Sequence, residues 1–186
     1  MVLTPANARE PGTAAPPFRL PDPDGRVVAL DDLSDARGLL VAFWCNHCPF
    51  VKHIKRGFAE FAREYRDRGL AIVAINANDT DAYPADAPDK MKADIDAFGY
   101  TFHYLIDASQ NVARAYDAAC TPDFYLFDGE RKLAYHGQFD ASRPKNEVPV
   151  TGADLRAAAD AVLSGQKVPG EQVPSIGCNI KWRTAR

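Results

Sequence analysis

The order of apolar and polar residues along the chain predicts alternating strands and helices. The runs Leu39–Phe43 and Leu70–Ile75 are continuously apolar, as strands buried on both faces of a sheet are. Between them, apolar residues recur every three or four positions from Phe50 to Tyr65, with charged residues on the opposite side. This spacing predicts an amphipathic helix, and Gly69 follows where a helix commonly ends.

The rest of the chain continues this alternation, which is typical of an α/β fold. Further strands are expected at Phe18–Leu20, Arg26–Leu30, Phe102–Ile106, Phe124–Phe127 and Lys132–Gln138, and further helices at Met91–Phe98, at Asn111–Asp117 and from the capping box Thr151–Asp154 to Gly165. Residues 1–17 are predicted to form an irregular arm and residues 166–186 an extended tail. We expect a single domain over residues 1–186.

The segment Cys45-Asn46-His47-Cys48 lies between the first buried strand and the amphipathic helix. A helix N-terminus carries unpaired N–H groups and a partial positive charge, and both favour a thiolate. His47 adds a cationic influence when it is protonated. We therefore expect Cys45, at or just before the first helical turn, to have a lowered pKa and to act as the nucleophile. Cys48 is then the resolving cysteine of a thiol–disulfide exchange pair at the surface.

Composition and charge limit the binding partners and the cellular compartment that we expect for this protein. The 186 residues have a net charge of −3 and a hydrophobic content of 46%, which argues against nucleic acid or an anionic membrane as a partner. No apolar run approaches the ~20 residues of a membrane span, and the N-terminus lacks the apolar core of a signal peptide. We expect a cytoplasmic protein, in which four cysteines indicate catalysis or metal binding rather than a disulfide framework.

Separated motifs resemble the thioredoxin superfamily, in particular its AhpC/TSA and TlpA-like members. They are Trp44–Cys48 between strand and helix, Thr121–Gly129 with its Thr-Pro step, and Pro21–Leu33, which is similar to the entry hairpin of these members. The ending Pro174–Trp182 resembles that of a peroxiredoxin-like group within the superfamily. The resemblance implies a thioredoxin-like fold with a central mixed β-sheet, flanking helices and an N-terminal β-hairpin extension.

The resemblance also implies supporting roles around the cysteine pair. Pro122 would be a cis-proline packed against the pair, and the Thr121 backbone would be open to an incoming substrate strand. The side chains of Phe43, Trp44 and Pro49 are expected to line the pair as well. A histidine before the second cysteine, here His47, is similar to the oxidising DsbA-like pattern. Such a histidine stabilises the thiolate and so favours the reduced form, which makes the disulfide the stronger oxidant.

Other residues have roles that the sequence leaves open. Cys120 is either an additional redox thiol or a small packed side chain, and Cys178 is either a third redox thiol within reach of Cys45 or an anchor for the tail. Arg143 is a candidate for stabilising a thiolate. The polar loop of residues 76–89 either forms a lip over the site or is a solvated connector. Thioredoxins keep a carboxylate where this chain has Leu39, so the proton acceptor for Cys48 is not identified; the unranked candidates are Glu60, Asp107 and Asp123.

The leading hypothesis is a thiol–disulfide oxidoreductase acting on protein or small-molecule disulfides. Its reducing partner is either a thioredoxin reductase-like protein or glutathione, and we expect no cofactor and no resident metal. One alternative is a peroxiredoxin-like peroxidase with Cys48 as the peroxidatic residue, although Val41 and Cys45 stand where peroxiredoxins have Pro and Thr. The other is a non-enzymatic metal- or partner-binding module that uses Cys45, Cys48, His53 and Cys178.

Overall fold

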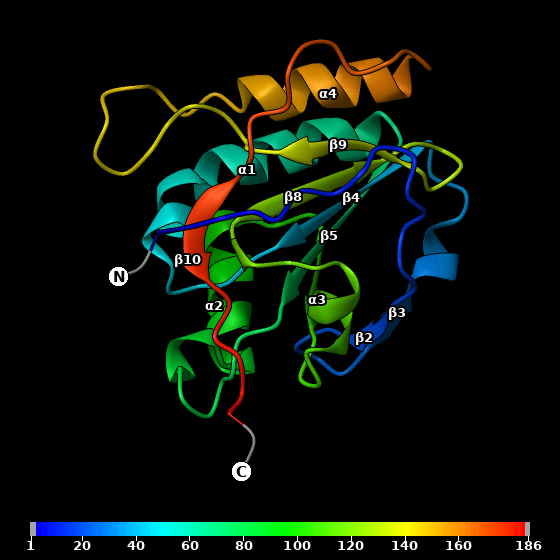
Figure 1. Ribbon diagram of the computed structural model, residues 1–186. Coiled ribbons are helices and arrows are strands. Elements are labelled where there is room, and N and C mark those ends of the chain that lie inside the picture. Colours follow the sequence, from blue (N-terminus) through cyan, green and yellow to red (C-terminus); the bar gives the residue numbers. More distant parts are fainter. Residues whose placement is uncertain (1–2, 185–186) are drawn as a thin grey trace.

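Among residues 3–184, which the computed structural model describes, a five-stranded mixed sheet forms the centre of the molecule (Figure 1). The strands lie in the order β6 (His103–Ile106), β5 (Leu70–Asn76), β4 (Gly38–Phe43), β8 (Asp123–Phe127) and β9 (Leu133–Gly137). β4 pairs in parallel with β5, and β5 with β6, whereas β8 and β9 are antiparallel to their neighbours. Because β4 is central, the loop that follows it opens at the carboxyl edge of the sheet, where α/β proteins gather their functional groups.

Helices cover both faces of this sheet, as predicted. α1 (Pro49–Asp67), α2 (Pro88–Phe98) and α4 (Ala153–Leu163) pack on one face, and α3 (Asn111–Ala115) packs on the other beside the hairpin of β2 (Arg19–Pro21) and β3 (Val27–Ala29). Short 3-10 turns lie at Leu30–Leu33 and Pro84–Asp86. None of the helices between residues 3 and 184 combines the length and the apolar character needed to cross a membrane.

β4 sends alternate side chains to opposite faces of the sheet. Ala42, and Trp44 just beyond the strand, belong to the core beneath α1, whereas Val41 and Phe43 belong to the core beneath α3. The prediction that Phe43 lines the cysteine pair is therefore wrong. Its ring instead meets the rings of two tyrosines edge-on, Tyr116 and Tyr125, with centroids 5.5 and 5.8 Å away.

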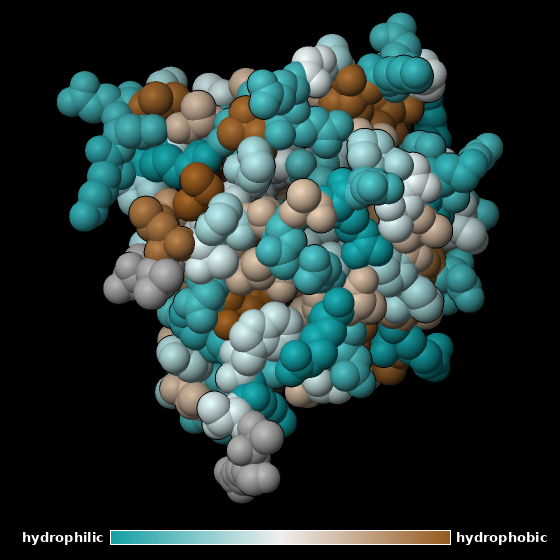
Figure 2. All heavy atoms as spheres, in the orientation of Figure 1, coloured by the Kyte–Doolittle hydropathy of each residue, from teal (hydrophilic) through white to brown (hydrophobic). Residues whose placement is uncertain are grey.

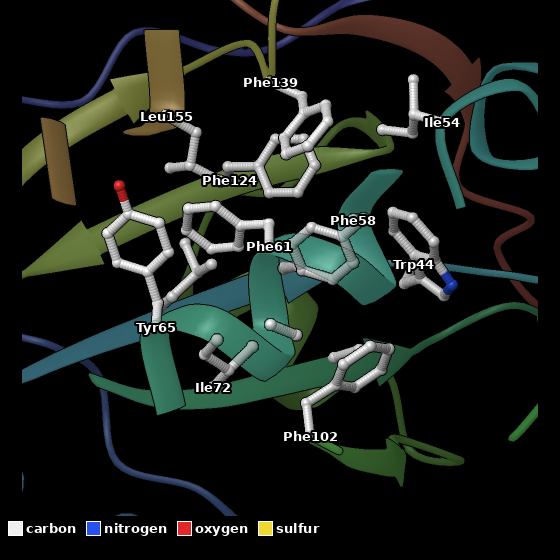
Figure 3. Close-up of a cluster of buried hydrophobic side chains, with 14 of the residues drawn as sticks. Trp44, Ile54, Phe58, Phe61, Tyr65, Ile72, Phe102, Phe124, Phe139 and Leu155 are labelled. Atoms are coloured by element: carbon white, nitrogen blue, oxygen red, sulfur yellow. The ribbon is translucent and has the colours of Figure 1, made fainter. Parts of the chain in front are cut away.

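The core beneath α1 is built around stacked and tilted aromatic rings (Figure 3). Phe58 lies at its middle, with ring centroids 4.8 Å from Trp44, 5.3 Å from Phe102 and 5.4 Å from Phe124. All these rings are buried, and aromatic pairs of this kind add about 0.5–1.5 kcal/mol each beyond the burial of their area. This cluster ties the middle of α1 to Trp44, just beyond β4, and to β8, so the loop between β4 and α1 rests on a rigid support.

The two ends of the chain meet in a second, smaller sheet. Here β10 (Ile176–Asn179) lies between β1 (Leu3–Pro5) and β7 (Cys120–Thr121), and it is antiparallel to both (Figure 1). The prediction of an irregular arm over residues 1–17 is thus wrong for residues 3–5, because the tail supplies a partner strand that local sequence could not reveal. Residues 1, 2, 185 and 186 of the predicted arm and tail lie outside the described residues.

Candidate active site

The two cysteines of the CxxC segment lie in the loop between β4 and α1. α1 begins at Pro49, which suits a first helical position because its missing N–H needs no partner there. Cys48 is therefore the residue that caps the helix, and Cys45 lies three residues before it. Cys45 thus precedes the first helical turn, as expected, whereas Cys48 stands at the capping position and not one turn further along the helix.

Both sulfur atoms contact Thr121, the residue before the cis Thr121–Pro122 peptide bond. The Cys45 Sγ lies 3.3 Å from Thr121 Oγ1, and the Cys48 Sγ lies 3.2 Å from the Thr121 carbonyl oxygen. The expected proximity of the pair to the Thr-Pro step is therefore present. The expected exposure is not, because both cysteine side chains are 0% exposed.

The electrostatics of the pair reverse the prediction made from the helix position alone. Hydrogen bonding from the Cys45 thiol lowers the pKa of Cys48 to about 5 against the opposing effect of burial, and the Cys178 thiol and the Val51 N–H act in the same direction. Burial raises the pKa of Cys45 well above its ordinary value, and the thiol of Cys48 and the carboxylate of Asp86 raise it further. The favoured thiolate is therefore that of Cys48, because the Cys45 and Cys178 thiols and the Val51 N–H hydrogen-bond to its sulfur, whereas burial and the Asp86 carboxylate oppose ionisation of Cys45.

Asp86 is the residue of this site that sequence reasoning missed. Its Oδ1 accepts the backbone N–H groups of Asn46 and His47 at 2.8 and 3.1 Å, and its Oδ2 accepts His47 Nδ1 at 2.6 Å and Asn78 Nδ2 at 2.8 Å. Asp86 is fully buried, and burial opposes its ionisation, but these donors hold the pKa of its carboxyl below the usual value. Of the two readings of loop 76–89, the structure supports the lip, because this carboxylate fastens the loop to the CxxC segment.

Two aromatic residues, Tyr104 of β6 and Tyr83 of the lip, also contact the CxxC segment. Asn46 is held from the other side by the Tyr104 hydroxyl, which donates to its Oδ1 at 2.8 Å. The ring of Tyr83 stacks on the imidazole of His47 with centroids 5.4 Å apart. The unranked proton-acceptor candidates have other surroundings: Asp123 bonds His136 and Tyr125, Asp107 bonds Ser109 and the Ala113 N–H, and Glu60 is exposed.

The tail strand β10 lies beside the pair, next to Thr121. Cys178 stands directly across from Thr121, and Asn179 stands across from Cys120. All four cysteines are free thiols and buried. Burial raises the pKa of Cys178 to about 12, and the neighbouring sulfur of Cys48 adds to this shift. Burial also raises the pKa of Cys120, whose Sγ points to the Pro122 carbonyl oxygen at 3.8 Å.

Two other predicted site residues lie apart from the sulfurs. The guanidinium of Arg143 donates to the carbonyl oxygens of Asp140 and Ser142 at 2.7 and 2.8 Å and to Gln138, so it holds its own loop instead of stabilising a thiolate. His53 bonds the Ser142 hydroxyl at 2.7 Å.

The side chains of Cys45, His47 and Asp86 form a possible metal-binding group, with their candidate ligand atoms within 4.8 Å of one another. This group differs from the predicted metal-binding set of Cys45, Cys48, His53 and Cys178. The Asp86 oxygens in that set already accept four donors, so a metal ion would have to compete with them.

Residues 11–136, more than half of the chain, match the AhpC/TSA family. The chain belongs to the AhpC/TSA family. Among curated relatives of this AhpC/TSA protein, the thiol-disulfide oxidoreductase ResA of Bacillus thuringiensis (strain Al Hakam) is 26% identical over 122 residues, which are 66% of this chain and 66% of the relative. A peroxiredoxin-like protein of Mycobacterium tuberculosis (strain CDC 1551 / Oshkosh) is 29% identical over 116 residues, 62% of this chain and 69% of the relative.

Solved structures resemble the AhpC/TSA protein over larger parts of its length. A hypothetical protein from Sinorhizobium meliloti 1021 has a TM-score of 0.96 at 55% identity, over 98% of this chain and 100% of that one. A thiol:disulfide interchange protein of the thioredoxin family from Chlorobium tepidum TLS has a TM-score of 0.63 at 16% identity, over 84% of this chain and 99% of that one. The second likeness shows the fold, which is thioredoxin-like as predicted.

Proposed function

We propose that this AhpC/TSA protein is a thiol–disulfide oxidoreductase whose Cys45 and Cys48 cycle between a dithiol and a disulfide. The observation that carries this proposal is that both sulfurs contact one residue, Thr121, at 3.3 and 3.2 Å. Two thiols that meet at one residue, one of them with a pKa of about 5, form a pair suited to exchange with a disulfide. The ResA relatives, which are named for this activity, support the same reaction class.

In this proposal Cys48 makes the first attack and Cys45 resolves, the reverse of the order expected from sequence. The Cys48 thiolate attacks one sulfur of a substrate disulfide and expels the other as a thiolate, which leaves a mixed disulfide on Cys48. Cys45 then attacks the Cys48 sulfur, gives up its proton and releases the second substrate thiol. The products are a Cys45–Cys48 disulfide and two substrate thiols, so the electrons balance without a cofactor.

Access to the buried sulfurs requires local movement of the tail or of the lip. A surface pocket beside Pro122 is lined by Phe50, His53, Arg143 and Ile176 among others, and it lies next to the start of α1. Hydrophobic residues are visible near the N-terminal end of the described chain in Figure 2, and the exposed Leu3 and Ile176 line an adjoining pocket. We propose that a disulfide-bearing protein or small molecule approaches there, beside the strand that covers Cys48.

The test is an equilibrium titration of the reduced protein with mixtures of reduced and oxidised glutathione. After acid quenching, alkylation and trypsin digestion, the peptide Gly38–Lys52 carries both cysteines, so an internal disulfide makes it two hydrogens lighter. We expect this form to appear and to be lost in Cys45→Ser and in Cys48→Ser, with Cys120→Ala as the matched buried-cysteine control. A peptide that stays fully reduced over the range from ~−300 to ~−120 mV contradicts the proposal.

A second candidate function, thiol peroxidase, is favoured by the position of Cys48 at the start of α1 and by its lowered pKa. In that reaction the Cys48 thiolate attacks a peroxide oxygen, becomes a sulfenic acid and is resolved by a thiol. Peroxide consumption that is lost in Cys48→Ser and persists at a reduced rate in Cys45→Ser would favour the peroxidase over the exchange reaction.

A further inference from the structure

The tail strand β10 is seated on the edge of β7, beside the Thr121–Pro122 step. Cys178 is paired with Thr121, whose carbonyl oxygen and hydroxyl contact the two CxxC sulfurs. Opposite residues of an antiparallel pair have Cα atoms about 4.5–5.5 Å apart. The tail therefore brings a third cysteine to the residue that already holds the other two.

The fit of β10 at this edge is close. A Cβ on Gly177 would lie 1.9 Å from the Thr121 carbonyl oxygen, so only a glycine lets the tail backbone approach this near. Cys178 is 4% exposed and belongs to the same buried cluster as Cys45 and Cys48. The close contact between the backbones of β10 and β7 thus keeps the Cys178 side chain inside the site and out of solvent.

The tail is anchored on both sides of Cys178. Before it, the Ser175 hydroxyl donates to the Gly137 carbonyl oxygen at 2.8 Å. After it, the Ile180 N–H donates to the Ala119 carbonyl oxygen at 3.0 Å, and the Lys181 N–H donates to Asn78 Oδ1 at 2.8 Å. These hydrogen bonds on both sides fix the position of Cys178.

Cys48 is the middle member of the three thiols. The Cys48 sulfur contacts the Thr121 carbonyl oxygen, and β10 pairs Cys178 with that same residue. Hydrogen bonding from the thiols of Cys45 and Cys178, and from the Cys178 N–H, lowers the pKa of Cys48. Since thiol–disulfide exchange needs the attacking sulfur in contact with the sulfur under attack, either neighbour can reach Cys48.

We propose that Cys178 is a second resolving cysteine, which competes with Cys45 for the mixed disulfide on Cys48. This inference rests on the proposed thiol–disulfide exchange. The Cys178 sulfur attacks the Cys48 sulfur of the mixed disulfide, a Cys48–Cys178 bond forms, and the bond from Cys48 to the substrate sulfur breaks. The substrate leaves as a thiolate and takes up the proton of Cys178. The oxidised protein then has its tail covalently closed over the site and Cys45 left as a free thiol.

Formation of the mixed disulfide also removes an obstacle to this attack. In the reduced protein the Cys48 sulfur contributes to the raised pKa of Cys178, after burial. Once Cys48 is bonded to the substrate it carries no charge, so that contribution disappears and Cys178 loses its proton more easily.

The test is a disulfide map of the oxidised full-length chain. The reduced protein is treated with oxidised glutathione, quenched in acid, alkylated with N-ethylmaleimide and digested with trypsin. The peptides Gly38–Lys52 and Val168–Lys181 carry the CxxC cysteines and Cys178, and Ala115–Arg131 carries Cys120. We expect Gly38–Lys52 joined to Val168–Lys181 in the wild type. Relative to the wild type, the amount of this joined peptide should rise in Cys45→Ser, fall by about tenfold or more in Cys48→Ser and stay unchanged in Cys120→Ala.

The outcomes separate this inference from the proposed function. An internal disulfide in Gly38–Lys52 with no joined peptide, in the wild type and in Cys45→Ser alike, overturns the role of Cys178 and leaves the exchange reaction standing. A joined peptide that persists in Cys48→Ser and disappears in Cys45→Ser overturns the assignment of Cys48 as the sulfur under attack. Absence of any disulfide in these peptides overturns both proposals.

Discussion

Gly177→Ala is the perturbation that most directly tests the seat of the tail strand. The added Cβ would lie 1.9 Å from the Thr121 carbonyl oxygen and 2.6 Å from its carbonyl carbon, whereas ordinary contacts begin at 3.4 Å. The obstructing atoms are backbone, so no rotamer change relieves the clash. β10 must therefore retreat from β7 by about 1.5 Å, which is more than a backbone hydrogen bond of ~2.9 Å tolerates.

The magnitude follows from the pairing that this retreat breaks. β10 meets β7 at two residue pairs, Cys178 with Thr121 and Asn179 with Cys120. Two lost backbone hydrogen bonds at about 0.5–1.5 kcal/mol each reduce the free energy of unfolding by about 1–3 kcal/mol. For a chain of this size each kcal/mol corresponds to about 2–4 °C in Tm, so we expect a decrease of about 2–12 °C.

The assay combines thermal unfolding of the reduced protein with maleimide labelling at a temperature well below Tm. Labelling of Cys178 is read in the tryptic peptide Val168–Lys181, and we expect it to be faster in Gly177→Ala because the tail is displaced. Asn179→Ala is the control, since Asn179 is an exposed residue of the same strand. A Gly177→Ala protein that matched this control in both Tm and labelling rate would show that the tail strand is not tightly held against β7.

Four further predictions concern the buried polar groups of the site. Thiolate absorbance of the reduced protein should appear with a midpoint near the pKa of about 5, vanish in Cys48→Ser and move to higher pH in Cys45→Ala. The pKa of Cys48 lies below the ordinary thiol value of ~8.5, so the stability that its thiolate contributes is complete above pH ~8.5 and is lost as pH falls through about 5. A Tm difference between wild type and Cys48→Ser that does not grow as pH rises from about 5 to ~8.5 would contradict this. Asp86→Asn should cost about 1–3 kcal/mol in urea unfolding, because Asn78 loses its acceptor, and it should lower the pKa of Cys45, with the exposed Asp89→Asn as the control. Tyr104→Phe should cost about 1–3 kcal/mol because the buried Asn46 Oδ1 loses its donor, and an unchanged unfolding midpoint would disprove that role.

The elements that sequence predicted well are those with local causes. The apolar run Leu39–Phe43 became the central strand β4, and the 3.6-residue spacing beyond it became α1. The predicted helix Met91–Phe98 became most of α2, and Gly99 follows it with φ of +60° at the helix C-terminus. The Thr121–Pro122 step was expected beside the cysteines from a family resemblance, and it is there.

The burial and protonation of the cysteines were decided only by the tertiary structure. Cys48 meets Thr121 across 73 positions of the chain, and the Asn46 N–H meets Asp86 across 40. No periodicity or turn signal carries such contacts, since each segment involved is locally consistent with an exposed loop. The lowered pKa at Cys48 depends on these distant groups together with the start of the helix.

The amino-acid order by itself thus determined a strand, a pair of cysteines and a helix in succession, because hydrophobic spacing and capping act over a few residues. Only the folded chain decided that Asp86 and the tail strand enclose that pair and that Cys178 joins it. The physical reason is that desolvation and hydrogen bonding of a thiol depend on what surrounds it in space, and those neighbours come from segments that local sequence does not connect.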